Sequence, residues 1–202
     1  MPADADLRAQ YERRRPLLET LARTLETGLR EALDSLPHID RVSFRAKSTT
    51  SYLGKASRYE HPLEDIEDQV AGRVLVFFTF DIDTVSAIAR GRWTAVELQH
   101  KQPERDAEFG YETWHHIFVI PEHVKPNGWS EVAEMPKTFE LQIRTLFMHA
   151  YAEPQHDFAY KSAAELPRDV RRQLGWIASS AWGADRAYAD VVARIQSDES
   201  RY

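Results

Sequence analysis

The 202-residue sequence contains no cysteine, and this absence excludes several kinds of functional site. Disulfide bonds, thiolate metal centres and cysteine nucleophiles all need a cysteine sulfur atom. A chain without cysteine fits the reducing interior of a cell, although it does not require one. We therefore expect a cytoplasmic protein whose chemistry does not depend on thiols.

The sequence also lacks an excess of basic residues, a long apolar run and an apolar N-terminal segment. Its formal net charge of −6 and its pI of about 5.8 argue against a surface coated in positive charge for polyanions. The longest apolar run, residues 74–78, is too short to span a bilayer, and the acidic residues 1–6 do not resemble a signal peptide. We expect a soluble protein without a membrane partner, in which any phosphate chemistry relies on a local basic cluster.

The spacing of apolar residues predicts an α+β fold with a mixed sheet of about five strands, flanked by helices at both chain ends. The expected strands cover residues 42–47, 73–80, 94–99, 113–120 and 137–145. The expected helices cover residues 16–36, 49–59, 83–90 and 146–161, with a long C-terminal helix from about residue 170. Pro16 would lie in a first helical turn, Gly91 would stop a helix, and Pro154 would kink or break one.

The composition is consistent with one domain. Hydrophobic residues make up 43% of the chain, which is enough to bury a sizeable core. We expect a single domain over residues 1–202, with its core at about 41–161 and helical extensions at 1–40 and 162–202.

One predicted strand carries charged side chains on a face of its own. In this strand Glu140, Gln142 and Arg144 alternate with three apolar residues, so the polar side chains point to one side of the sheet. Burying charge is unfavourable unless the charge is paired or binds a ligand. An edge strand with one solvated face explains the alternation equally well. The assignment of a site therefore depends on which other charged groups reach the same face.

A second segment combines cations with a predicted helix start. Arg45 and Lys47 are two residues apart on a strand and point to the same side. Ser48 and Ser51 open the following helix, and Lys55 lies four residues beyond Ser51 on the same helical face. Cations beside a helix N-terminus favour a polyphosphate site without a glycine-rich loop. Taken one by one, the same residues could be a helix cap with scattered surface lysines.

Two further segments carry candidate ligand contacts. Asp68 precedes the most apolar strand, where a carboxylate could hold Mg²⁺ together with substrate phosphates, and Gly72 would allow backbone or ligand to approach closely. A solvated acidic turn is the alternative. Tyr111 follows a glycine and could stack on a base, a contact worth about 1–3 kcal/mol. His115 and His116 alternate in direction, so at most one of them faces the site.

The order and spacing of these segments resemble the RelA/SpoT nucleotidyltransferase domain, in the compact form of the small alarmone synthetases. The resemblance covers roughly residues 41–161, and five ordered blocks in the right succession make it specific. The blocks are Arg45-x-Lys47-Ser48-x-x-Ser51-x-x-x-Lys55, then Asp68-x-x-x-Gly72-Arg73, then Gly110-Tyr111-x-x-x-His115, then Glu140-x-Gln142-Ile143-Arg144-Thr145, and finally Met148-His149 with Ala152-Glu153.

This family transfers pyrophosphate from ATP to the ribose 3′-hydroxyl of GTP or GDP and so makes the alarmones pppGpp and ppGpp. The resemblance implies that the donor ATP is held by Arg45, Lys47, Ser48, Lys55 and Arg73. It implies that Asp68 and Glu140 are the catalytic carboxylates and bind Mg²⁺, with Glu140 acting as metal ligand or as base on the attacking hydroxyl. It also implies an acceptor pocket in which Tyr111 stacks on the base, lined by His115, Gln142, His149 and Ala152. Such a transfer needs in-line positioning, cations and a proton acceptor.

Three departures from the family pattern concern the acceptor. Glu112 stands where a basic or neutral polar residue is usual, residues 108–110 replace an Asn-Gly turn, and His149 stands where asparagine is common. A carboxylate beside the acceptor would repel its 5′-phosphates. An alternative acceptor is therefore the 3′-CCA end of tRNA, the target of a toxic branch of the family. In that case the cluster at residues 13–15 would be a phosphate contact rather than a solvated group of arginines.

Other possibilities stay open or are excluded. An inactive nucleotide-binding module is a third reading, although the presence of both Asp68 and Glu140 argues against it. His156 and Asp157 look like the metal-binding pair of the family's hydrolase domain, but we interpret them as structural because too few residues precede position 41 for that domain. The amphipathic terminal helices make a homo-oligomer plausible. The sequence does not reveal an antitoxin partner or an allosteric ligand.

Overall fold

The computed structural model describes residues 2–101, 113–161 and 166–199 and contains a five-stranded mixed sheet. Its strands are β1 (Ile39–Ala46), β2 (Val70–Val76), β3 (Ala95–Lys101), β4 (Thr113–Val119) and β5 (Thr138–Thr145). They lie in the order β1-β2-β5-β4-β3. Strands β2 and β5 run parallel, and the other neighbouring strands are antiparallel. The predicted α+β class with a mixed sheet is therefore confirmed.

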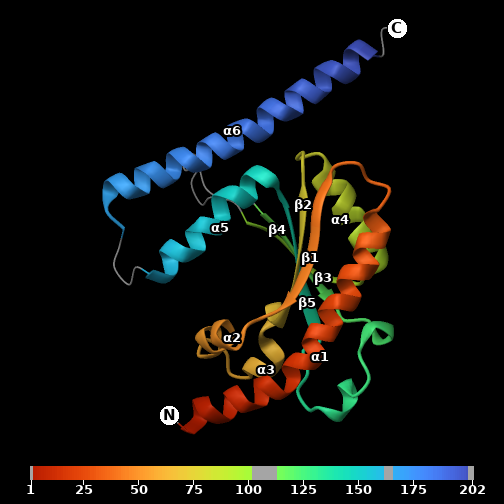
Figure 1. Cartoon of the computed structure of the whole chain (residues 1–202), viewed down its shortest axis with the longest axis vertical. Helices are drawn as coiled ribbons and strands as arrows, with labels where there is room; N and C mark the ends of the chain where they lie inside the picture. Colours follow the sequence, from red (N-terminus) through yellow and green to blue (C-terminus); the bar gives the residue numbers. More distant parts are fainter. Residues whose placement is uncertain (1, 102–112, 162–165, 200–202) are drawn as a thin grey trace.

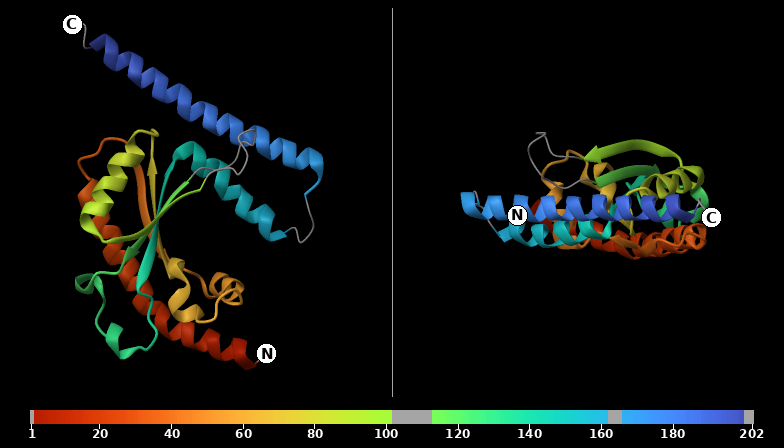
Figure 2. Two further views of the ribbon diagram at one scale, coloured as in Figure 1. Left: turned by 180° about the vertical axis from the view of Figure 1, so that it is seen from behind. Right: turned by 90° about the horizontal axis from the view of Figure 1, so that it is seen from above.

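Helices lie on both sides of this sheet. The helices are α1 (Pro2–Leu33), α2 (Thr49–Ala56), α3 (Pro62–Asp65), α4 (Asp81–Arg92), α5 (Leu146–Lys161) and α6 (Arg168–Glu199), with short 3-10 turns η1 (Glu67–Gln69), η2 (Glu122–Val124) and η3 (Trp129–Glu131). Figures 1 and 2 show α1 and α4 on one face of the sheet, α2 and α5 towards opposite ends of the other face, and α6 beyond α5. None of the helices that the structure describes is long and apolar enough to cross a membrane.

The main core lies between the sheet and the pair α1 and α4. Strand β5 contributes the fully buried Phe139, Leu141 and Ile143, and α1 contributes a stripe of buried leucines that includes Leu18 and Leu25. The apolar half of the β5 alternation therefore faces the core, as period-two spacing predicts. The polar half is left on the opposite face, where only the ends of the sheet are covered.

Helix α1 begins at Pro2, so the prediction that it begins at Pro16 is wrong. Its buried stripe continues upstream of the proline through Tyr11 and Arg14, which are only 0% and 4% exposed. These residues and Leu18 are spaced i, i+3 and i+7, which places them on one helical face. Packing of this face against the domain keeps the helix continuous, although Pro16 lacks an N–H donor.

The bounds of other elements also differ from the sequence-based expectation, most clearly in β2 and α4. Strand β2 covers Val70–Val76 rather than residues 73–80, because the chain leaves the sheet at Phe77, which is exposed together with Phe80. Helix α4 continues past Gly91 to Arg92, and the backbone N–H of the buried Trp93 donates to the carbonyl of Ala89 at its end. Helix α5 covers Leu146–Lys161 as predicted, and it is not broken at Pro154. Local breaker residues are thus overridden by packing.

Candidate functional site

The strand register aligns polar side chains in rows across the open face of the sheet. Paired residues on neighbouring strands point to the same side, so each row can be read from the pairing. One row runs Ser43, Arg73, Gln142, His115 and Gln99, and the next runs Arg45, Ala71, Glu140, Ile117 and Glu97. The sheet itself therefore brings together five of the predicted site residues, which come from four different strands.

The Asp68 carboxylate is held between two lysines at the edge of this face. Lys47 Nζ lies 2.5 Å from Asp68 Oδ2, and Lys55 Nζ lies 3.0 Å from Asp68 Oδ1. Burial by itself would raise the pKa of Asp68, but the hydrogen bond and charge of Lys47, followed by those of Lys55, bring that pKa below its ordinary value. Asp68 is consequently ionised at neutral pH and shares its charge with two ammonium groups.

Local structure explains how these three residues meet. The backbone N–H of Lys47, just after β1, donates to the carbonyl of Gln69 at 2.8 Å, which joins the end of β1 to the turn that carries Asp68. Ser48 then caps α2 by accepting a hydrogen bond from the Ser51 N–H at 3.2 Å. The helix is short, so Lys55 in its last turn still reaches Asp68.

Glu140 is the second carboxylate of the site and is only 8% exposed. It accepts hydrogen bonds from His115 Nδ1 and from Gln142 Nε2, the latter at 3.2 Å. Burial favours a raised pKa for Glu140, but the hydrogen bond and charge of His115 outweigh it and lower that pKa. The charge of Asp68 acts in the opposite direction and favours a raised pKa. Glu140 pairs with Ala71 across β5 and β2, and Ala71 follows Asp68 by three residues in the chain.

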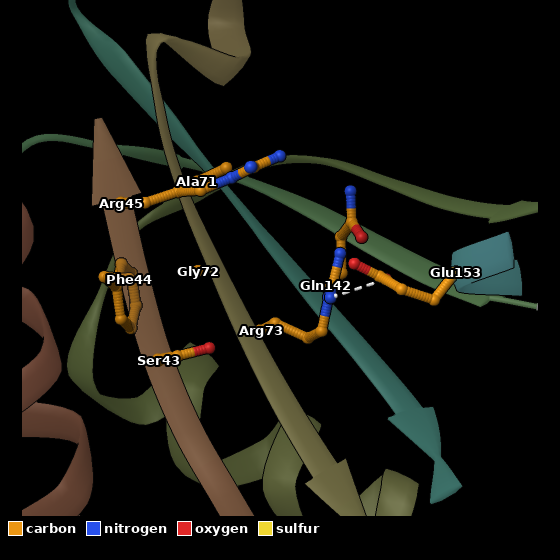
Figure 3. A pocket seen from close by; sticks show the side chains of 8 residues that line it. All are labelled: Ser43, Phe44, Arg45, Ala71, Gly72, Arg73, Gln142 and Glu153. Carbon is orange, nitrogen blue, oxygen red and sulfur yellow. Dashed lines mark hydrogen bonds and ion pairs between the residues drawn. The ribbon is translucent and has the colours of Figure 1, made fainter. Parts of the chain in front are cut away.

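A groove of about 160 Å³ lies beside these carboxylates, and Figure 3 shows Arg45, Arg73, Gln142 and Glu153 around it. Arg73 Nη1 donates to Glu153 Oε2 at 3.0 Å and lies 3.5 Å from His149 Nδ1. Arg45 is exposed and makes no ion pair with any residue that the structure describes. The groove thus offers two guanidinium groups to an anion. That of Arg45 has no ion-pair partner among the described residues, and an incoming anion could replace the exposed Glu153 carboxylate at Arg73.

Glu153 is a site residue to which the sequence reasoning assigned no role. It belongs to α5 and lies one helical turn after His149, with 3.5 Å between His149 Nδ1 and Glu153 Oε2. Burial and the charge of Arg73 lower the pKa of His149, so its imidazole is neutral at pH 7. The i, i+4 spacing of the two residues was the signal in the sequence, because it places both on one helical face.

Gly72 has a different role from the one predicted. A side chain at this position would meet the ring of Phe44, whose Cε1 atom lies 2.4 Å from the ideal Cβ position. Phe44 packs with Trp93 and Phe139 in the core. Gly72 lines the groove, but the space that its missing side chain leaves is filled by a core aromatic ring rather than by backbone or ligand.

The remaining predicted residues lie in different surroundings. Ala152 is buried on α5, three residues after His149. Arg144 is buried on the open face, donates from Nε to Thr113 Oγ1 at 3.4 Å, and has its pKa lowered to about 9, mainly by burial. Tyr111, together with the rest of residues 108–112, lies outside the described residues. So do the side chains of His156 and Asp157.

The arginine cluster at residues 13–15 is not the surface patch considered from the sequence. It lies inside α1, and Arg14 is buried and donates from Nη2 to the carbonyl of Ala133 at 2.7 Å. Arg15 pairs with Glu19 at 3.1 Å on the exposed side. The prediction of a solvated group holds for Arg13 and Arg15, which are exposed, and is wrong for Arg14, because helical geometry separates neighbouring side chains by about 100°.

Known proteins match the chain over most of its length. Residues 44–165 match the family described as the region found in RelA/SpoT proteins. The GTP pyrophosphokinase YjbM of Bacillus subtilis (strain 168) is 28% identical over 179 residues, which cover 86% of this chain and 82% of the relative. The small alarmone synthetase 1 of Bacillus subtilis bound to its product pppGpp has a TM-score of 0.74 at 24% identity, and the match covers 93% of this chain and 98% of that one. Small alarmone synthetase 2 of the same organism has a TM-score of 0.74 at 21% identity, with 91% and 98% covered. These structures share the fold of this chain.

Proposed function

We propose that this chain, which belongs to the RelA/SpoT family, transfers pyrophosphate from ATP to the 3′-hydroxyl of GTP or GDP, with AMP as the leaving group. The curated relative named as a GTP pyrophosphokinase and the related structure bound to pppGpp support this activity. The observation that carries the proposal is the joint position of Asp68 and Glu140 on one side of the sheet, next to the cations Lys47, Lys55 and Arg73.

Different residues of the site carry out different parts of the reaction. Lys47, Lys55, Arg45 and Arg73 bind and orient the donor's phosphates and offset the charge that spreads over the transferring group. Glu140 is ionised at neutral pH, so it can accept the proton of the attacking hydroxyl when that hydroxyl lies within hydrogen-bond reach. His115 and Gln142 keep the Glu140 carboxylate in place. Glu153 of α5 lines the groove and lies beside His149.

Mg²⁺ is part of the proposal, and the residues present fit it. Asp68 and Glu140 provide hard oxygen ligands, and Mg²⁺ usually binds one or two carboxylates together with substrate phosphates. Within the described ranges, no group of three or more His, Asp or Glu residues is placed to hold a metal ion. When bound, it would neutralise charge on the transferring phosphates.

Two alternatives are less well supported. The tRNA alternative rests on Glu112 and on the arginines at residues 13–15. Glu112 lies outside the described residues. Arg14 is buried and donates a hydrogen bond to the Ala133 carbonyl. An inactive binding module does not explain why both carboxylates and all four donor-side cations lie on one face. Self-association stays part of the proposal, because α6 exposes Trp176, Tyr188 and Val191. A cytoplasmic location is likewise an expectation.

The test is to incubate the full chain with γ-labelled ATP and one acceptor at a time, namely GDP, GTP or tRNA, with and without Mg²⁺. We expect Mg²⁺-dependent label in ppGpp or pppGpp, and no label with the Glu140→Gln variant. Label found only in tRNA would establish the alternative acceptor. An absence of label with every acceptor would overturn the assignment as a transferase.

A further inference from the structure

The N-terminal half of α1 contacts the donor side of the site, although it lies outside the core expected at residues 41–161. Tyr11 is fully buried, and its hydroxyl donates to the backbone carbonyl of Lys47 at 2.9 Å. The ring of Tyr11 stacks on the ring of Tyr52 in α2, with 3.8 Å between centroids and 7° between planes. Figure 1 shows the start of α1 beside α2 and α3. The helix is thus in contact with the segment that carries Lys47 and the Ser48 cap.

This contact completes the anchoring of the Lys47 backbone. The Lys47 N–H already donates to Gln69, the residue after Asp68, and the hydroxyl of Tyr11 binds the Lys47 carbonyl from the other side. With both backbone groups held, the Lys47 ammonium is directed at Asp68 Oδ2. Because phosphoryl transfer depends strongly on position, a small shift of this ammonium would weaken the hold on the donor's phosphates.

A second contact from the same helical face supports the same role. Arg14, three residues after Tyr11, donates to the carbonyl of Ala133 in the segment that leads into β5. Strand β5 begins at Thr138 and carries Glu140, so this turn of α1 contacts both the segment that leads into β5 and the segment that carries Lys47. Burying a hydroxyl or a guanidinium within an apolar stripe is unfavourable unless the group is hydrogen-bonded. Here the Tyr11 hydroxyl binds the Lys47 carbonyl, and the Arg14 guanidinium binds the Ala133 carbonyl.

We propose that Tyr11 is a positioning residue for the donor site, whose hydroxyl holds the Lys47 backbone so that Lys47 and Asp68 keep their places for the donor's phosphates. The identity of the donor as ATP rests on the proposed function. The hydrogen bond itself does not, so the geometric part of the proposal can be tested without any nucleotide.

The stacked pair provides its own matched control. The hydroxyl of Tyr52 is buried and has no hydrogen-bond partner within the part of the chain that the structure describes. Tyr11→Phe and Tyr52→Phe therefore remove the same atom from the same ring stack. Only Tyr11→Phe breaks a hydrogen bond to the Lys47 carbonyl. A general effect of losing a tyrosine hydroxyl should appear in both variants, and a positioning effect only in the first.

The first experiment measures donor binding by calorimetry with a non-hydrolysable ATP analogue, together with the KM for ATP and for the acceptor. We expect Tyr11→Phe to weaken analogue binding by about five- to tenfold, which is the size of one hydrogen bond. The KM for the acceptor should stay within about twofold, and Tyr52→Phe should resemble the wild type in both values. Equal donor affinity in the two variants, or an equal rise of both KM values in Tyr11→Phe, would overturn the positioning role.

The second experiment needs no nucleotide. Acylation of lysines by a soluble reagent, followed by mass spectrometry, reports how well the Lys47 ammonium is held. We expect Lys47 to react several-fold faster in Tyr11→Phe than in Tyr52→Phe, with the exposed Lys137 as internal reference. Unchanged Lys47 reactivity would refute the inference alone. A wild-type protein that does not bind the ATP analogue would instead refute the proposed function, and the acylation result would still decide whether Tyr11 holds Lys47.

Discussion

His115 and His116 are adjacent in β4 and lie on opposite faces of the sheet. His115 donates to the Glu140 carboxylate among polar neighbours. His116 is fully buried, its ring stacks on Phe118, and neither ring nitrogen has a hydrogen-bond partner among the residues described. Burial, followed by the charge of Arg90, lowers the pKa of His116 to about 4. The same type of side chain thus donates a hydrogen bond to a carboxylate on one face and is a neutral aromatic ring in the core on the other.

The difference extends to the two faces as a whole. On the open face, Asp68 is paired with two lysines and Glu153 with Arg73, whereas Arg45 is exposed to solvent. On the core face, leucine, phenylalanine and isoleucine exclude water and leave no partner for a charge. Substitutions on the open face should therefore act mainly on activity, and those on the core face on stability.

The largest expected effect comes from the two carboxylates of the open face. Asp68→Asn and Glu140→Gln keep the shape of the side chain and remove its charge, so each should lower the transfer rate by about 10³-fold or more. Initial rates with labelled ATP measure this, and thermal unfolding checks that the fold is kept. The exposed residues Asp83 and Glu60 offer the controls Asp83→Asn and Glu60→Gln, which should stay near the wild-type rate. More than a tenth of the wild-type rate in either site variant would contradict the assignment.

The donor-side cations come next. The double variant Arg45→Ala, Lys47→Ala should lower the rate by about 10²–10³-fold whichever acceptor is used, because the lost charges act on the transferring phosphates. The control removes the same two residue types from exposed positions outside the groove, as Arg58→Ala with Lys137→Ala. Rates measured over a range of ATP concentrations separate the variants. Full activity of the site variant would disprove the donor assignment.

The core face should show its effect in the pH dependence of stability. The pKa of His116 is about 6.5 in the unfolded chain and about 4 in the folded one, so only the unfolded state takes up the proton between these values. Stability should consequently be lost as the pH falls from about 6.5 to about 4, by about 3 kcal/mol for this group. His116→Leu should flatten this part of the curve, measured by urea unfolding, whereas His123→Leu at an exposed position should not. Parallel curves for His116→Leu and the wild type would contradict the prediction.

The acceptor side should show the smallest effects. Tyr111→Ala should lose about 1–3 kcal/mol of stacking with the acceptor base, and Tyr111→Phe should keep most of it. If the acceptor is GDP or GTP, Glu112→Arg should improve its binding by replacing repulsion with attraction. Transfer to tRNA would instead fall steeply with rising salt, because phosphate contacts release counterions. Assays of both acceptors at two salt concentrations decide between them, and efficient, salt-insensitive transfer to GDP would remove the tRNA alternative.

The sequence alone determined those features that depend on local periodicity. Alternation in β5 assigned Glu140 and Gln142 to one face and Phe139 to the other, because strand side chains repeat every two residues. The spacing of Arg45, Lys47 and the Ser48 cap likewise predicted cations beside the start of α2. The order of the strands and longer helices followed from the same patterns, whereas the short helix α3 was not predicted and several element ends differ.

Only the tertiary structure decided which distant groups meet. Tyr11 reaches Lys47, Arg14 reaches Ala133, and Arg73 reaches Glu153 across 36, 119 and 80 positions of the chain. Packing against the domain, rather than Pro16, also decided where α1 begins. Packing likewise placed the ring of Phe44 in the space beside Gly72. Such contacts depend on how whole helices and strands pack together, and a local pattern of residues carries no information about the partner that packing will bring to it.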